Sequence, residues 1–521
     1  MPVLRPILLI LVIFLEESKS ARILGIAGIP SYSHQLFYRP IWLELAKRGH
    51  HLTLLTTDPI EDVPNNIRQI DLHFSYQIRH VKHNITMKMQ EYNLDYIKVW
   101  NSYGRMLEDI VENELNHPEV VTLINNETEK FDLLIMEYIP QVLSAFSVRF
   151  NCPYISIFSA EIGNFYHQAL GNALHPVLYP ETFLPQQINL NFQDRLISTF
   201  YHFYFFLDQI FYETFKEDRL VKRHFGDGYP PINKIIRNVS LVFVNSHPVF
   251  NVKPLGPGFV RIGGGLHMKK KQELPQVNEI KEFLDSASEG AIYFSLGTNV
   301  RRNHISEGFL KIAADVFKEL PYKIIWKLDM DITEKSSNIK IFRWLPQQDV
   351  LRHKNVKLFI TQCGAQSLEE SILAEVPLLA IPYVSDQKMN ARKISDRGLG
   401  IEIDKDTMTK EILKRSILEV IKNDSYRERV RETANLLLDE PMSSLEKAIW
   451  WTEYVIRHKG ARHFWHPNID LPLYQYLLLD VMGFVLIISV VSIYSLYKTL
   501  KFVTRLLCKW RKAKTEKQKN S

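Results

Sequence analysis

The sequence predicts an α/β protein with two Rossmann-like, doubly wound domains that face a cleft, followed by one C-terminal transmembrane helix. Short apolar segments alternate with helical patterns in both halves of the 521 residues, which is typical of parallel sheets covered by helices. A segment rich in glycine, proline and charge, residues 252–289, separates the halves as an interdomain linker. A chain of this length also needs more than one hydrophobic core.

Composition excludes several classes of protein. The chain is 46% hydrophobic and 23% charged, as in a folded globular protein, and its mean hydropathy of −0.14 excludes a polytopic membrane protein. The net charge of +6 comes from residues 498–521, where nine Lys/Arg and one Glu give +8 and leave −2 for the rest. The body therefore has no nucleic-acid-binding charge. Three cysteines are too few for a disulfide scaffold.

The two ends predict a single-pass type I membrane protein. Residues 1–20 combine Arg5, an apolar stretch and small residues before Ala21, which is typical of a cleaved signal peptide. Residues 477–497 predict a transmembrane helix, and the basic tail 498–521 is cytosolic by the positive-inside rule. The body then lies in the lumen. Four glycosylation sequons agree with this: Asn84, Asn126, Asn238 and Asn423.

The extreme C-terminus favours the endoplasmic reticulum membrane. Lys519 and Lys517 stand at the third and fifth positions from the end, like the dilysine retrieval signal of proteins of that membrane. The alternative is a basic tail that only stops transfer. Cys508 lies beside the cytosolic membrane face and is a candidate for palmitoylation, although an unmodified thiol is the preferred interpretation.

The first half, residues 21–251, begins with a βαβ pattern. A strand over 22–27, a turn over 28–34 and a helix that ends at Arg48 precede a second strand over 51–56. A similar unit follows, with strands over 131–136 and 154–158 around a helix over 142–150, whereas residues 77–116 are polar and helical. The aromatic segment 196–215 is slightly favoured as a helix buried in the core. Its alternatives are the wall of an acceptor pocket or a surface against the membrane.

The second half, residues 290–442, alternates more regularly. We expect strands over 291–296, 323–326, 340–344, 356–361, 377–382 and 400–403. We expect helices over 309–320, 367–374, 388–397 and 410–421. Residues 443–476 are assigned to a helical return and a pre-membrane segment.

Residues 344–390 hold the side chains that suggest chemistry. Trp344 is expected at the end of a strand, where its ring offers an apolar face to a base, and Gln347 can pair with an amide-like base edge. Gly364 precedes a helix whose N-terminal N–H groups suit a phosphate. Glu370, one turn into that helix, suits the hydroxyls of a ribose. Asp386 and Gln387 follow the next strand and suit a sugar.

This segment is similar to the donor-binding signature of the UDP-glycosyltransferase family, and the resemblance covers nearly the whole chain. The resemblance is carried by WLPQ from Trp344, QCG from Gln362, Glu370, VP from Val376 and DQ from Asp386. The loop FSLGTN from Phe294 is similar to the family's phosphate loop, and residues 33–57 look most like insect members. The resemblance implies a GT-B fold with the acceptor in the first domain and the UDP-sugar in the second.

The resemblance also implies roles for individual residues. His34 takes the place of the family's catalytic base, which removes the proton of a hydroxyl acceptor, and Glu137 takes the place of its aspartate partner. UDP-sugar is the co-substrate, and neither a cofactor nor a metal is expected, because no Asp-x-Asp motif stands out. The donor site is expected to contain Ser295, Gly297, Thr298, Trp344, Leu345, Gln347, Gln362, Gly364, Ser367, Glu370, Asp386 and Gln387.

Four positions depart from the family pattern. Glu137 replaces aspartate, and Gln362 replaces a histidine beside the diphosphate, so one charge-assisted bond is lost at a cost of about 1–2 kcal/mol. Cys363 replaces a glycine and is expected to be a structural, partly buried thiol. Glu375 replaces a glycine, which costs about 1 kcal/mol if the position needs a positive φ.

The leading hypothesis is an inverting transferase that moves a sugar from UDP-sugar to a small lipophilic acceptor. Glucose is favoured over glucuronate because the chain is most like insect members. The alternative is a catalytically weakened or silent lumenal protein that binds ligands or modulates active relatives. The acceptor and any association with itself or with relatives stay open at this stage.

Overall fold

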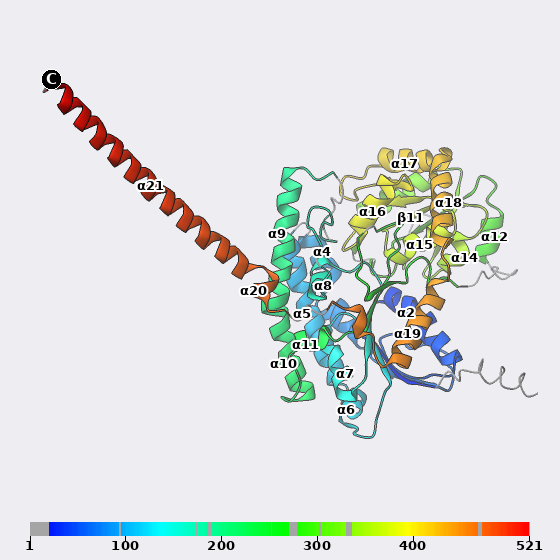
Figure 1. Ribbon diagram of the computed structural model, residues 1–521. Helices are drawn as coiled ribbons and strands as arrows, with labels where there is room; N and C mark the ends of the chain where they lie inside the picture. The colour runs from blue at the N-terminus through cyan, green and yellow to red at the C-terminus, as the bar shows by residue number, and fades with distance from the viewer. Residues whose placement is uncertain are drawn as a thin grey trace, which may run out of the picture. The chain divides into compact units, whose positions relative to one another are not determined.

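The computed structural model describes most of the chain (Figure 1). The described residues are 20–92, 95–172, 174–182, 184, 189–251, 253–269, 279–301, 304–329, 336–466 and 471–519. The predicted signal peptide therefore lies outside the described residues except for Ser20. The chain divides into two compact units, residues 1–465 and residues 466–521.

The first half of the body folds around a parallel sheet. Its seven strands lie in the order β3-β2-β1-β4-β5-β6-β7, and every neighbouring pair is parallel. The strands are β1 Arg22–Ala27, β2 His51–Thr56, β3 Ile67–Asp71, β4 Leu133–Glu137, β5 Tyr154–Phe158, β6 Leu241–Val244 and β7 Phe259–Arg261. The last of these falls inside the range assigned to the interdomain linker.

Helices connect these strands. They are α2 Tyr32–Lys47, α3 Ser75–Gln77, η1 Ile78–Lys82, α4 Ile85–Tyr92, α5 Tyr96–Leu115, α6 Pro118–Asn125, η2 Gln141–Ser144, α7 Ala145–Phe150, α8 Asn164–Ala169, α9 Phe192–Asp208, η3 Gln209–Glu213, α10 Thr214–Phe225 and α11 Ile232–Ile236. The polar region 77–116 is helical, as predicted.

The second half has a six-stranded parallel sheet in the order β10-β9-β8-β11-β12-β13. Its strands are β8 Ala291–Ser295, β9 Lys323–Lys327, β10 Ile339–Phe342, β11 Val356–Thr361, β12 Leu378–Ala380 and β13 Gly400–Glu402. Its helices are α12 Glu279–Asp285, α13 Glu307–Lys318, α14 Gln347–Leu351, α15 Ala365–Leu373, α16 Gln387–Asp396, α17 Lys410–Lys422 and α18 Ser425–Leu438. Two Rossmann-like domains, the GT-B arrangement, are thus present as predicted.

All six predicted strands of the second half are present within one or two residues of the predicted bounds. One detail was wrong: β10 ends at Phe342, so Trp344 lies two residues beyond the strand and not at its end. The predicted helix over 142–150 is divided into the 3₁₀ turn η2 and the helix α7.

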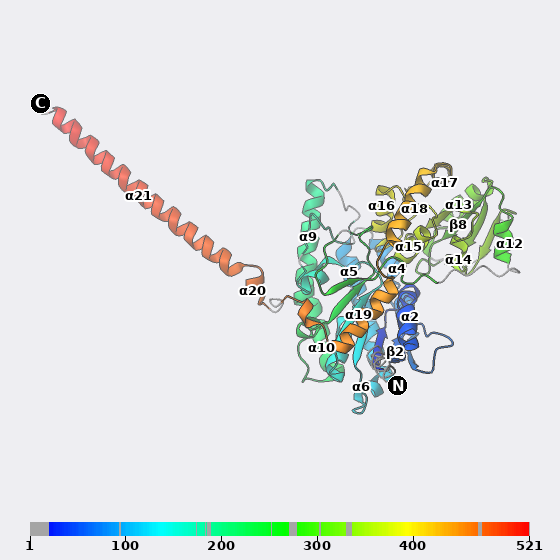
Figure 2. The ribbon, with the colours of Figure 1, turned by 45° about the vertical axis from the view of Figure 1, so that its right-hand side comes forward.

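The chain returns to the first half after α18. Helix α19, Ser444–His458, buries Ala448, Ile449 and Val455 in the same core as β1, and it packs beside α2 (Figure 2). The turn η5, Arg462–Phe464, follows, and the buried Trp465 donates from Nε1 to the carbonyl of Ser240 at 2.9 Å. This return ties the two halves of the body together.

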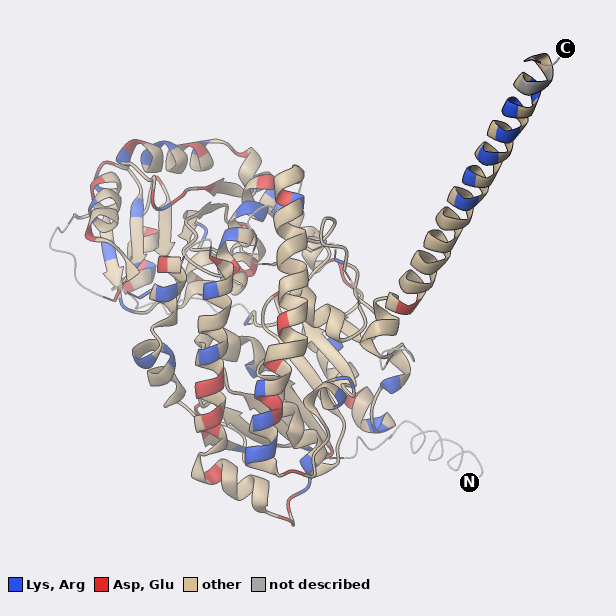
Figure 3. Ribbon diagram, turned by 90° about the vertical axis from the view of Figure 1, so that its left-hand side faces the viewer, with Lys and Arg blue, Asp and Glu red and all other residues tan. Residues whose placement is uncertain are grey.

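The aromatic segment 196–215 is not buried in the core, so the slightly favoured interpretation was wrong. It forms most of α9, all of η3 and the start of α10. Only one face, which includes Ser198 and Phe205, is buried against the rest of the body. Apolar side chains are exposed on the other face: Phe192, Leu196, Phe200, Phe203, Leu207, Phe211, Tyr212 and Phe215. Figure 3 shows few charged residues along α9. A 3.6-residue repeat does not say which face of such an apolar helix will be covered.

The second unit consists of α20, Leu473–Tyr476, and the long helix α21, Leu479–Lys519. Among the described residues, one stretch, Leu479–Thr515, is long and apolar enough to cross a membrane by length and composition. Figure 3 shows Lys and Arg gathered along the later part of this helix. The segment 477–497 predicted to span the membrane contributes its apolar part.

One strained residue lies between α15 and β12. Glu375 has a φ of +58°, in the left-handed region that favours glycine, as suspected from the sequence. Its carboxylate accepts from Arg431 Nε at 2.9 Å, and both side chains are about half exposed, at 44% and 55%. Solvent screens both charges, so the ion pair contributes little to stability.

We predict that Glu375→Gly is more stable than Glu375→Ala by about 1 kcal/mol, because both lose the ion pair and only glycine relieves the φ strain. Thermal unfolding of the full chain in detergent measures the difference. Equal unfolding temperatures for the two variants would show that the positive φ carries no cost.

Candidate active site between the two sheets

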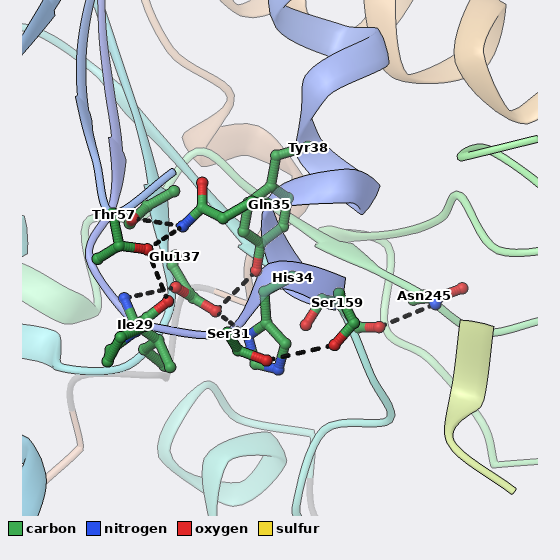
Figure 4. Close-up of polar contacts among 12 residues, drawn as sticks. Ile29, Ser31, His34, Gln35, Tyr38, Thr57, Glu137, Ser159 and Asn245 are labelled. Carbon is green, nitrogen blue, oxygen red and sulfur yellow. Dashed lines mark hydrogen bonds and ion pairs between the residues drawn. The ribbon is translucent and has the colours of Figure 1, made fainter. Parts of the chain in front are cut away.

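A histidine and a carboxylate meet where the first sheet reverses its strand order. His34 lies in the first turn of α2, just after β1, and Glu137 is the last residue of β4. Because β1 and β4 are parallel neighbours, their carboxyl ends meet, and His34 Nδ1 lies 2.6 Å from Glu137 Oε1 (Figure 4). A carboxylate only accepts, so Nδ1 carries the proton and Nε2 of the neutral ring is left as the basic nitrogen.

Glu137 is held by more than the histidine. Tyr38 donates its hydroxyl to Glu137 Oε1 at 2.9 Å, and the backbone N–H of Ile29 donates to Oε2 at 3.3 Å (Figure 4). Tyr38 is buried, and burial together with the Glu137 charge raises the pKa of its phenol well above the usual value. Tyr38 therefore stays protonated and fixes the carboxylate beneath His34.

Two cavities meet at this histidine. One, of about 210 Å³, is walled by apolar and aromatic side chains of the first half, including Trp100, Tyr103 and Phe165. The other, of about 270 Å³, lies mainly against the second half. Both cavities are lined by His34, Ser159, Ala160, Asn299, Asp386 and Gln387.

The second cavity contains nearly all of the predicted donor residues. Its lining includes Gly297, Thr298, Trp344, Leu345, Gln347, Gln362, Gly364, Ser367, Glu370, Asp386 and Gln387. Ser295 is the exception among the predicted residues: it is buried behind the loop, and its hydroxyl accepts from the N–H of Gly297 at 3.3 Å. Ser295 therefore supports the loop and does not line the cavity.

Trp344 stands at the mouth of this cavity with 57% of its surface exposed. The ring of Tyr32, from the start of α2, meets it edge to face at 5.3 Å, so the two halves of the body touch here. The ammonium of Lys327 lies 4.9 Å from its ring centroid. An exposed indole in this position is suited to stacking on a flat ligand.

Gln347 and Glu370 bind each other, which the sequence did not reveal. Gln347 Nε2 donates to Glu370 Oε2 at 2.6 Å and to Ser367 Oγ at 3.0 Å, while its oxygen accepts from Tyr293 at 3.0 Å. Gln347 is therefore occupied within the protein, although both residues line the cavity.

A buried histidine stabilises the ionised form of Glu370. His267 Nε2 lies 3.2 Å from Glu370 Oε1, and its Nδ1 lies 3.6 Å from Glu369 Oε2. Burial alone would raise the pKa of Glu370, but the hydrogen bond and charge of His267 lower it below the usual value. The two carboxylates in turn raise the pKa of His267 against the effect of its burial.

The loop after β8 lies against the residues that precede α15, on one wall of the cavity. Gly297 has a φ of +72°, which favours glycine, and a Cβ added there would also overlap Gln362 Nε2 unless that side chain moved. Cys363 is completely buried, not partly buried as expected, and has a φ of +67°. Gly364 then caps α15, and Gln366 reaches across to the carbonyl of Ser159 at 3.0 Å.

Asp386 and Gln387 begin α16 at the junction of the two cavities. Asp386 accepts from Asn390 Nδ2 at 2.9 Å, and burial raises the pKa of its carboxyl group. The side-chain oxygen of Gln387 accepts from the N–H groups of Tyr383 and Val384. These bonds hold both side chains at the cavity wall.

Glu161 joins the two halves beside the cavities. Its carboxylate oxygens lie 2.7 Å from Lys253 Nζ and 2.8 Å from Lys393 Nζ, the latter on α16. Burial alone would raise the pKa of Glu161, but the two lysines hold it at about 2. The three side chains, which are 5–18% exposed, therefore form a mostly buried, charged clamp across the cleft.

Sequence reasoning missed Tyr32, Tyr38, Glu161 and Lys327. Tyr38 lies one helical turn after His34, so the i, i+4 spacing could have found it. The other contacts join segments far apart in the sequence, and no local pattern marks them. The described residues contain no group of three or more His, Cys, Asp or Glu that could hold a metal ion.

Known proteins resemble the chain over nearly its whole length. The profile of the family described as "UDP-glucoronosyl and UDP-glucosyl transferase" matches residues 22–514. UDP-glucosyltransferase 2 of Dactylopius coccus is 31% identical, covering 99% of both chains. UDP-glucuronosyltransferase 2C1 of Oryctolagus cuniculus is 26% identical, covering 93% of this chain and 98% of its own length.

Solved structures show the same fold. A UDP-glucose: anthocyanidin 3-O-glucosyltransferase in complex with UDP matches with a TM-score of 0.54 and 16% identity, covering 84% of this chain and all of its own. The glycotransferase of kitacinnamycin matches with a TM-score of 0.55 and 15% identity, covering 85% of this chain and all of its own.

We predict that Glu161→Gln lowers the free energy of unfolding by about 3–5 kcal/mol, because it leaves two lysines without a counter-charge in a buried place. The wild-type contribution is present above pH 4.5, the ordinary carboxyl pKa, and is lost as the pH falls towards 2. Thermal unfolding of the full chain as a function of pH measures both effects.

Glu319 provides the matched control. Its oxygens also meet two lysines, Lys410 at 2.6 Å and Lys414 at 2.8 Å, but all three side chains are about 40% exposed. Glu319→Gln should cost much less stability than Glu161→Gln, because solvent screens the exposed charges. If the two variants lose the same stability, the clamp across the cleft is no stronger than a surface pair.

Proposed function

The chain belongs to the family of UDP-glucuronosyl and UDP-glucosyl transferases, and we propose that it transfers glucose from UDP-glucose to a hydroxyl group of a small lipophilic molecule. The observation that carries the proposal is the 2.6 Å contact of His34 with Glu137 at the junction of two cavities. Glucuronate is the second candidate sugar, because a UDP-glucuronosyltransferase also resembles the chain over most of its length.

His34 is proposed as the general base. The acceptor binds in the aromatic cavity with its hydroxyl at Nε2, which takes the proton as the acceptor oxygen attacks the anomeric carbon of the sugar. UDP leaves with the bonding electrons from the opposite face, so the configuration inverts. Glu137 holds the ring by Nδ1 and stabilises the imidazolium that forms.

The donor is proposed to occupy the cavity of the second half. Trp344 stacks on the uracil, the Gly297 loop and the start of α15 take the diphosphate, and Asp386 and Gln387 take the sugar. Glu370 takes the ribose hydroxyls, with Gln347 acting as the residue that orients it. Neutral donors and a helix N-terminus receive the diphosphate, so the proposal needs no metal.

The protein is proposed to be a type I protein of the endoplasmic reticulum membrane, with a signal peptide, a lumenal body and the tail 498–521 in the cytosol. The apolar stretch of α21 and the basic residues after it support the anchor and its orientation. Asn126, Asn238 and Asn423 are exposed and are the proposed glycosylation sites, whereas Asn84 is half-buried. Lys517 and Lys519 support retrieval. The domain boundaries predicted from the sequence are proposed with one change: the first domain extends through β7 to Arg261, and the second begins with α12 at Glu279.

A second candidate is a silent lumenal protein that binds ligands or modulates active relatives. The neutral Gln362 at the cavity wall is the observation that favours it. The contact of Glu137 with His34 argues against it, because the longer carboxylate still reaches the base.

The two candidate functions are distinguished by incubating the protein with several UDP-sugars and a mixed panel of phenols and lipophilic alcohols, and by identifying the products. We expect a glycoside by mass spectrometry, with glucose as the transferred sugar. If neither the wild type nor Gln362→His released UDP from any UDP-sugar, the transferase proposal would be rejected in favour of the silent binder.

We predict that Trp344→Ala weakens UDP binding by about 5–150-fold, the usual contribution of a stacked base. Titration of the full chain with UDP measures the dissociation constant, and Trp450→Ala removes another partly exposed tryptophan, on α19, as a control. An unchanged UDP affinity would remove Trp344 from the donor site.

We predict that His34→Ala lowers kcat by about 10²–10⁴-fold and leaves UDP affinity nearly unchanged. Glu137→Ala should act in the same direction, and the double variant should lose little beyond the worse single one, because the two residues act as a unit. Steady-state kinetics and UDP titration measure this, with the exposed His51→Ala as the control. Additive losses would show that Glu137 does not act through His34.

We predict that a chain ending before Leu477 is secreted as a soluble, glycosylated protein, because the apolar stretch and its basic flank are removed. Alkaline washing of membranes followed by centrifugation measures its distribution, with the full chain as the control. Retention in the washed membranes would mean that the exposed aromatic face of α9 and α10 is a second anchor.

A further inference from the structure

Lys327 is a cation in the cavity of the second half, and the proposed function assigns no role to this residue. It is the last residue of β9 and half-buried, and its Nζ donates to the carbonyl of Gly297 at 2.8 Å. The same ammonium lies 4.9 Å from the ring centroid of Trp344. It therefore stands between the proposed phosphate loop and the proposed base platform.

Gln362 approaches the same glycine from α15's side of the cavity. A Cβ on Gly297 would overlap Gln362 Nε2, so the amide lies directly against the loop that Lys327 also contacts. Gln362 can donate a hydrogen bond but carries no charge. A cation and a neutral amide thus flank one residue of the loop, on the wall where the family resemblance places a histidine.

The ammonium of Lys327 is free to take an anion. It has three donors, and Gly297 is the one hydrogen-bond partner found for it in the described part of the chain. No carboxylate forms an ion pair with it among the described residues, and burial lowers its pKa to about 8. The other lysine on this cavity wall, Lys269, is exposed at the rim.

We propose that Lys327 binds the diphosphate of the UDP-sugar and supplies the positive charge that Gln362 cannot carry. This rests on the proposed function of the cavity. When a base stacks on the face of Trp344 that the ammonium now covers, the flexible lysine stem lets the ammonium move to the phosphate oxygens. Two of its three donors then reach the phosphates while the third keeps the Gly297 carbonyl.

Binding of UDP and uridine to the full chain in nanodiscs tests the proposal, because the two ligands share the base and ribose and differ by the diphosphate. Isothermal titration compares wild type, Lys327→Met, Gln362→His and the double variant. We expect Lys327→Met to weaken UDP by about 10–100-fold and uridine by less than about twofold. In the Lys327→Met background, Gln362→His should restore much of the lost UDP affinity when its imidazole is charged at pH 6.

Lys323→Met is the matched control, because Lys323 lies at the other end of β9 against Phe283. Lys327→Arg, which keeps the charge, should retain most of the UDP affinity. If Lys327→Met does not fold, Lys327→Gln is compared with Lys327→Arg. Equal weakening of UDP and uridine would place Lys327 at the base, and unchanged UDP binding would place it outside the site, so either result overturns the proposal. A wild type that binds neither ligand would overturn the proposed function as well.

Discussion

The contact of His34 Nδ1 with Glu137 Oε1 is the constraint on which the rest of the site depends. It exists because β1 and β4 are parallel neighbours, so that the turn after one strand and the last residue of the other share an edge. Tyr38 and the Ile29 N–H hold the carboxylate, which in turn fixes the imidazole at the junction of the two cavities. A change that separates β1 from β4 would therefore break the contact of His34 with Glu137 without altering either residue.

The second half repeats this arrangement for a different purpose. β8 and β11 are the parallel neighbours at its point of reversal, and the loops after them carry Gly297 and Gln362. The polar groups behind this wall are already paired, as Gln347 and Glu370 show. Paired groups keep their geometry before a ligand arrives, which lowers the ordering cost of binding. Two contacts hold the two halves of the body together beside the cavities. They are the edge-to-face contact of Tyr32 with Trp344 and the ion pairs of Glu161 with Lys253 and Lys393.

The parallel sheets could be predicted because buried strands have short, continuous apolar runs, as in residues 356–361. The strand Ile67–Asp71 was missed because three of its five side chains are polar. Phe259–Arg261 was missed because it lies within the segment rich in glycine and proline that was assigned to the linker. The donor residues were located by resemblance, whereas their mutual bonds were not. The contact of Lys327 with Gly297 joins a strand end to a loop 30 residues away in the sequence, and only the fold brings the two together.

The departures from the family pattern differ in what they disturb. Glu137 carries one more methylene than aspartate, yet three donors still converge on its carboxylate, so the extra length is absorbed within the strand end. Glu375 stores backbone strain, but its carboxylate faces Arg431 on the surface, away from the cavities. Gln362 alone changes the charge of the cavity wall. Under the proposed function, activity then depends on the charge beside the diphosphate. Lys327, whose ammonium contacts the Gly297 carbonyl, offers a full positive charge there, whereas the neighbouring helix N-terminus contributes only partial charges.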